Sequence, residues 1–272
     1  MANKSLDGAV ERFVISRTAW RVTILILFAF LAVLGAFLSL TKGSSVITMS
    51  QIVELLLNPG TDPQSQIIWN IRMPRTIVGA LVGINLSLSG AILQAIMRNP
   101  LADPHIIGIS SGAGLAGVVI MILFPALEYL ITPVAFVGAM LAAICIYILA
   151  WKNGIKPVRI ILAGVAVSAF LSAGISGLMI FYSDRVHGAL MWMVGGLAAR
   201  SWPHVSIILP YAAIGLVLAL ASASYLNILQ LGDEMARGLG VNVEVTRIVM
   251  TAIAALLAAS AVSVVGLLGF VG

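Results

Sequence analysis

The side chains of this chain that could do chemistry are few, and they lie at the ends of long apolar runs. All ten aspartates and glutamates occupy such ends or the connections between runs, and the three histidines form no H-E-x-x-H or comparable cluster. No G-x-x-x-x-G-K-[ST] motif is present to cradle the phosphates of ATP. Ion-driven carriers generally place ionisable groups or broken helices inside the membrane. The sequence therefore indicates a chain that is not an enzyme, has no metal site and binds no cofactor of its own.

Two arginines form the first candidate site. Arg72 and Arg75 flank Met73 and Pro74, just before an apolar run. Proline fixes its own φ and disfavours a helical conformation in the residue before it. We therefore expect both guanidinium groups to be displayed near the membrane surface in a restricted geometry. They either anchor the helix at the interface or form a charged socket for an acidic partner protein.

The polar connection from Gln230 to Arg247 is the second candidate site. It predicts a short helix with acids in its first turn and glycines at its end, in which Asp233 and Arg237 stand at i,i+4. This helix is either a solvated turn or a docking element for a cytoplasmic partner. The residues that would dock are Gly232, Asp233, Glu234, Arg237, Leu239 and Gly240.

Two smaller groups belong to the apolar runs themselves. Asn99-Pro100-Leu101 predicts a tight turn between two neighbouring runs. Ser168, Ser172 and Ser176 recur on one face of another run. These serines either allow helices to pack closely or line a transport pathway.

The elements that must position all these residues are membrane helices. The chain is 61% hydrophobic and 9% charged, whereas ordinary soluble domains carry about 25% charged residues. The net charge of +5 is spread over the ends of the runs without forming a patch, so nucleic acid is not expected as a partner. The fold class predicted from this composition is all-α, a polytopic transmembrane helical bundle in contact with membrane lipid.

Seven runs are long enough to cross a bilayer. They cover residues 19–40, 76–97, 106–124, 133–151, 160–181, 205–229 and 248–265. With the N-terminus inside, ten lysines and arginines lie on the inner side and five on the outer, so a short N-terminal tail, residues 1–18, is predicted to be cytoplasmic. Residues 1–272 are expected to form one transmembrane domain. Small residues in the runs, such as Gly79, Gly83, Gly112 and Gly114, predict close helix packing.

Short motifs in a fixed order extend this interpretation. They are Arg72-Met73-Pro74-Arg75-Thr76, Leu88-Ser89-Gly90-Ala91, Asn99-Pro100-Leu101-Ala102-Asp103-Pro104, Gly108-Ile109-Ser110-Ser111-Gly112-Ala113, Gly164-Val165-Ala166, Trp192-Met193-Val194-Gly195-Gly196, Leu231-Gly232-Asp233-Glu234, Leu239-Gly240 and Gly266-Leu267-Leu268-Gly269-Phe270-Val271-Gly272. Together they resemble the permease subunits of ABC importers for iron–siderophores, haem and vitamin B12. The resemblance implies the type II importer fold with about ten spans, so the chain is expected to be truncated at Gly272. It also implies that the protein resides in the bacterial cytoplasmic membrane.

The resemblance also implies roles for the candidate residues. Arg72 and Arg75 would receive glutamates of an extracytoplasmic substrate-binding protein, and the helix at Asp233 would couple to an ATPase. Asn99, Pro100 and Leu101 would close a cytoplasmic gate, while Ser168, Ser172 and Ser176 would line the pathway.

The implied partners complete an importer. They are a second permease subunit, identical or related, two ATPase subunits that carry ATP and Mg²⁺, the binding protein, and a ferric siderophore or related chelate as cargo. An ion-coupled secondary transporter of another fold is the main alternative, and a channel or structural membrane protein is the third.

Overall fold

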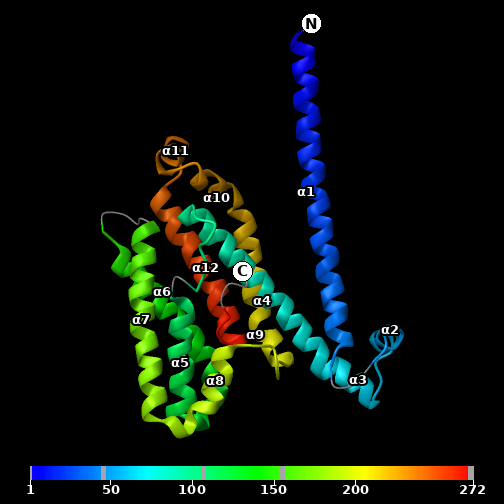
Figure 1. The fold of residues 1–272 in the computed structure, drawn as a ribbon, viewed down its shortest axis with the longest axis vertical. Coiled ribbons are helices and arrows are strands. Elements are labelled where there is room, and N and C mark those ends of the chain that lie inside the picture. The colour runs from blue at the N-terminus through cyan, green and yellow to red at the C-terminus, as the bar shows by residue number, and fades with distance from the viewer. Residues whose placement is uncertain (1, 44–46, 106–107, 153–156, 269–272) are drawn as a thin grey trace. The chain divides into compact units, whose positions relative to one another are not determined.

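The computed structural model describes residues 2–43, 47–105, 108–152 and 157–268, with side chains from Thr18 onward, and this part of the chain is helical without strands (Figure 1). The prediction of an all-α fold is therefore confirmed. The chain divides into two compact units, Met1–Thr76 and Ile77–Gly272.

The first unit contains one long helix and a short helical cluster. α1 (Ala2–Thr41) is followed by α2 (Met49–Leu57), α3 (Pro63–Ile67) and a π-helical turn, η1 (Ile68–Arg72), which leads directly into α4 (Met73–Met97). A small core joins the end of α1 to these elements, and it consists of Leu40, Ile47, Ile52 and Ile68. The Trp69 indole N–H donates to the Leu55 carbonyl at 3.0 Å and so fixes η1 against α2.

The second unit holds the remaining helices. They are α5 (Ile109–Leu123), η2 (Pro125–Leu130), α6 (Ile131–Ala150), α7 (Pro157–Phe181), η3 (Ser183–Arg185), α8 (Val186–Val194), α9 (Trp202–Ala221), α10 (Ala223–Gln230), α11 (Asp233–Gly238) and α12 (Val243–Val265). Within this unit α8 and α11 lie at opposite ends of the bundle (Figure 1). The predicted single span 205–229 is two helices, because α9 ends at Ala221 and α10 begins after Ser222.

One of the seven predicted spans is a helix too short to cross a bilayer by itself. Six helices of the described residues are long and apolar enough to cross a membrane, and the span expected at 106–124 is instead the 15-residue helix α5. At 1.5 Å per residue α5 is about 22 Å long, short of the roughly 30 Å hydrocarbon core. Gly108, with φ of +74°, delays its start, and the 3₁₀ turn at Pro125 ends it. Because most of α5 is buried in protein, its ends do not have to match the lipid.

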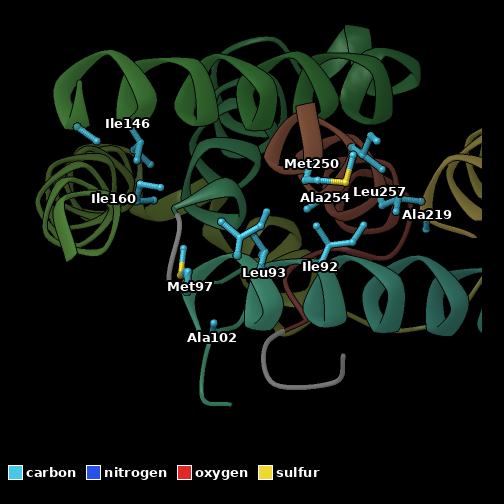
Figure 2. Packing of buried hydrophobic residues seen from close by; sticks show 13 residues of the cluster. Ile92, Leu93, Met97, Ala102, Ile146, Ile160, Ala219, Met250, Ala254 and Leu257 are labelled. Carbon is cyan, nitrogen blue, oxygen red and sulfur yellow. The ribbon is translucent and has the colours of Figure 1, made fainter. Parts of the chain in front are cut away.

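Helix α12 forms the centre of the second unit. Over its most apolar window 72% of the residues are buried, against 17% for α7. Small side chains such as Ala254, Ala258 and Ala261 allow this burial on all sides. Figure 2 shows one cluster of the core, to which α4, α6, α7, α9 and α12 all contribute. Its members are Ile92, Leu93, Ile96, Met97, Ala102, Ile146, Ala150, Ile160, Ala219, Met250, Ile253, Ala254 and Leu257.

Two kinds of contact fix the positions of these helices. Gly112 and Gly138 bring the backbones of α5 and α6 so close that a side chain at either position would collide with the other helix. Asn85 of α4 donates to the Ser260 hydroxyl of α12 at 2.8 Å inside the apolar core. The prediction of close packing at Gly112 is thus confirmed, whereas Gly83 faces open space.

Candidate functional site

The first candidate site does not have the expected geometry at Arg72. This side chain is only 6% exposed, and its guanidinium donates to the carbonyl oxygens of Leu40 and Thr41 at 2.6 and 3.1 Å. Those carbonyls lie at the end of α1, where the last turn of a helix lacks partners of its own. Gly43 lies against the guanidinium, and a Cβ there would meet Arg72 Nη2 at 2.7 Å. The prediction that both guanidiniums are displayed at the surface is therefore wrong for Arg72.

The local reason for this error is Pro74. Met73 is helical, with φ of −61° and ψ of −55°, and its N–H donates five residues back to Ile68 instead of four. The wider π turn lets the helix continue through a proline, which in a regular helix would clash with the carbonyl four residues earlier. Arg75 then falls on the exposed side of α4. Of the two candidate arginines, only Arg75 is available to a partner protein.

The second candidate site is a short helix, as predicted. α11 covers Asp233–Gly238 and is held by Ala236, which is fully buried in a small cluster with Leu229 and Val243. Glu234 and Arg237 are exposed, as are Leu239 and Gly240 beyond the helix end. The i,i+4 spacing does not pair Asp233 with Arg237: Asp233 contacts Arg98 and Arg247, with N···O distances of 3.3 and 3.0 Å, and no ion pair to Arg237 occurs among the described side chains.

An apolar ridge on this segment was missed at the level of sequence. Leu231, Met235 and Leu239 are 60%, 60% and 58% exposed and follow one another at intervals of four residues. Met235 lies on α11 and Leu239 follows the last residue of this helix, one turn after Met235, whereas Leu231 precedes the helix and is separated from it by Gly232, whose φ is +110°. The spacing of four residues is the only signal of these positions in the sequence. We call these three residues the docking ridge. Exposed apolar side chains that lie close together are typical of surfaces that contact another protein.

The turn between α4 and α5 lies next to α11, because Arg98 reaches Asp233. Asn99 Oδ1 accepts from the N–H of Leu101 at 3.0 Å, and Gln94 Nε2 donates to the Pro100 carbonyl at 2.9 Å. Pro100 and Leu101 are exposed, the latter to 76%. The structure therefore brings two separately predicted sites together, the turn at 98–101 and α11.

The three serines of α7 do not share one environment. Ser172 and Ser176 are exposed, whereas Ser168 lies against the start of α5, where a Cβ at Gly108 would meet its hydroxyl oxygen at 2.9 Å. Ser168 thus makes a packing contact. Ser172 and Ser176 remain open to lipid, to another protein or to a pathway.

The fold defines a multi-pass membrane protein with a short exposed helix, α11, at one end of its second unit. The chain belongs to the FecCD transport family, which matches residues 30–272. It is therefore a permease subunit of the ABC importers, with six long apolar helices among the described residues. This result agrees with the resemblance found in the sequence and excludes a secondary transporter of another fold.

Individual relatives support the same assignment. The Fe(3+)-citrate import system permease protein YfmD of Bacillus subtilis is 35% identical over 94% of this chain and 77% of its own length. The iron(3+)-hydroxamate permease FhuG of the same organism is 36% identical over 89% and 75%, respectively. The cobalamin permease BtuC of Halobacterium salinarum is 41% identical over 76% of this chain and 56% of its own length. A solved ABC transporter, assigned to the metal-chelate type and inward-facing, superposes with a TM-score of 0.81 at 28% identity, covering 92% of this chain and 78% of that one.

Proposed function

We propose that this chain imports a ferric siderophore or a related metal chelate, with α11 and the docking ridge as the contact to an ATPase subunit. Two ATPases would supply ATP hydrolysis, and a second permease subunit, identical or related, would complete the pathway. The names of relatives that carry iron–citrate, iron–hydroxamate and cobalamin support this class of cargo. Iron chelates are favoured because two of these three relatives carry them.

The observation that carries the proposal is the docking ridge. Its three apolar side chains project from a segment whose inner side is fixed by buried Ala236. A short helix that presents apolar residues at i and i+4 suits a groove on a partner protein. Charged Glu234 and Arg237 stand exposed beside the ridge and would set the register of docking.

The two sides of the membrane are assigned from the predicted position of the N-terminus. With the N-terminus in the cytoplasm, α11 lies on the cytoplasmic side, where an ATPase would be, and Arg75 lies outside. Exposed Arg75 would pair with a carboxylate of the binding protein. Asn99, Pro100 and Leu101 would then stand at the cytoplasmic mouth as the gate, and Ser172 and Ser176 would face the pathway.

The docking ridge is tested by exchanging Met235 and Leu239 for glutamine and measuring co-purification with the cognate ATPase. Burying each side chain contributes roughly 1.5–3 kcal/mol, so the double variant should bind the ATPase more than a hundredfold more weakly. The matched control replaces Leu190 and Met191 of α8 by glutamine, because these residues are also exposed but lie at the opposite end of the bundle. This control should bind the ATPase as wild type does. Unchanged ATPase binding in the ridge variant would refute docking through α11.

Cargo is tested separately in proteoliposomes that contain the whole importer. Uptake of ⁵⁵Fe bound to a citrate or hydroxamate chelator should depend on ATP and on the binding protein. An excess of gallium chelate should compete, while cobalamin should not. Competition by cobalamin alone would assign the importer to the vitamin instead of iron.

A further inference from the structure

One carboxylate joins three elements at the α11 end of the second unit. Asp233 Oδ1 lies 3.0 Å from Arg247 Nη2 and 3.3 Å from Arg98 Nη2. Arg247 belongs to the first turns of α12, and Arg98 is the residue that follows α4. Asp233 itself begins α11, the proposed contact to the ATPase. The same oxygen therefore links the docking helix both to the central helix and to the turn of the proposed gate.

The two halves of this arrangement differ in strength. The Arg247 side chain is 2% exposed, and a buried cation that loses its partner is strongly destabilising. Arg247 is fixed further by its backbone carbonyl, which accepts from the Tyr147 hydroxyl of α6 at 3.2 Å. Arg98 is 40% exposed and its ion pair is longer, and such solvated pairs contribute little and are screened by salt. The Asp233–Arg247 contact is thus the stronger of the two, and the Asp233–Arg98 contact is the one that opens first.

The turn at residues 98–101 can move as a unit when Arg98 moves. Hydrogen bonds from Gln94 to Pro100 and from Leu101 to Asn99 close the turn on itself. Arg98 has a positive φ of 50°, which few residues other than glycine adopt. Gly232 leaves room for the guanidinium, because a Cβ there would lie 3.3 Å from Arg98 Nη1. The backbone conformation at Arg98 and the absence of a side chain at Gly232 therefore both accommodate the contact between Arg98 and Asp233.

We propose that Asp233 is a positioning residue that transmits movement of α11 to the turn at 98–101 through its separable contact with Arg98. The inference rests on the proposed function, since α11 moves only if an ATPase holds it. When the Asp233–Arg98 contact is formed, it keeps the turn beside α11. When this contact breaks, the turn is released while Arg247 still holds α11 to α12. The gate residues 99–101 can then change position without detaching the docking helix.

Arg98→Gln is the variant that tests this link, in the whole importer reconstituted in proteoliposomes. We expect ATPase co-purification and the maximal rate of ATP hydrolysis to stay within twofold of wild type. Substrate imported per ATP hydrolysed should fall at least fivefold, and Arg98→Lys should restore part of it. The matched control is Asp184→Asn, which breaks the exposed Asp184–Arg185 pair in η3 but leaves the hydrogen bond from Arg185 to the Ile122 carbonyl, and it should leave the ratio unchanged.

A distance measurement makes the test independent of activity. Spin labels at Leu101 and Gly238 report the separation of the turn and α11 with and without nucleotide. In wild type the separation should change together with nucleotide state, and in Arg98→Gln it should stay at the longer value in both. An unchanged ratio of transport to hydrolysis, or an unchanged distance response, in Arg98→Gln with the ATPase still bound would overturn the inference. Loss of ATPase binding in the docking-ridge variant concerns the proposed function alone, so the two failures are distinguishable.

Discussion

Replacing Arg72 by methionine should destabilise the end of α1 rather than weaken docking of a binding protein. The guanidinium donates to two carbonyl oxygens of that helix end, from Leu40 and Thr41. Hydrogen bonds from a charged donor contribute about 1.5–3 kcal/mol each. Part of that gain is offset because a buried cation no longer has to be desolvated. We therefore expect a net loss of about 3 kcal/mol in the free energy of opening this corner.

Hydrogen exchange at the backbone amide of Lys42 measures this opening. That amide donates to the Leu38 carbonyl at 3.1 Å, one turn back in α1, and it exchanges only when the corner opens. A loss of about 3 kcal/mol corresponds to exchange roughly a hundredfold faster. Arg72→Lys should give an intermediate rate, because lysine keeps the charge but not the planar fork of donors.

Arg75→Met is the matched control, since Arg75 comes from the same motif but is exposed. In the Arg75→Met variant the Lys42 amide should exchange at a rate within twofold of the wild-type rate. Equal acceleration in both variants, or none in Arg72→Met, would show that the buried guanidinium does not hold the end of α1.

Three further predictions follow from the fold. In a background without the native cysteine, cysteines at Thr61 and Lys152 should label from opposite sides of the membrane, the first from outside, and labelling from the same side would mean that α5 does not cross. Gly112→Val should lower the melting temperature in detergent by several degrees, because overpacking costs about 1–3 kcal/mol or more, whereas Gly83→Ala in open space should not. Arg75→Glu should weaken binding-protein docking at least tenfold, with Arg75→Lys intermediate, and an unchanged affinity would leave Arg75 as a membrane anchor.

The helices were predictable because their signals are local. A charge-free apolar run ended by proline, glycine or arginine is readable in one stretch of sequence, and α7 at Pro157–Phe181 differs from the expected span by three residues. α11 was predictable for the same reason, since its acids and closing glycines are neighbours in the chain. The length of α5 was not, because burial within the bundle removes the need to match the bilayer.

The candidate sites were predicted less well because their contacts are not local. Asp233 has a possible partner four residues away, but it contacts Arg98 and Arg247, which only the packed bundle brings near. The backbone preference before Pro74 was overridden by a π turn, and this rotated Arg72 inward. Rules for i,i+4 pairs and for residues before proline describe isolated segments, and tertiary contacts outweighed both here.

The shortness of α5 has a consequence for how the protein is made. A 15-residue helix that begins after a left-handed glycine cannot bridge the bilayer by itself, so the insertion machinery receives a weak signal when α5 leaves the ribosome. Stable insertion should wait until α6 is synthesised and Gly112 meets Gly138. The two helices then enter as a hairpin, and a substitution in α6 that slows this step would change the yield and orientation of α5 without touching any residue of the pathway.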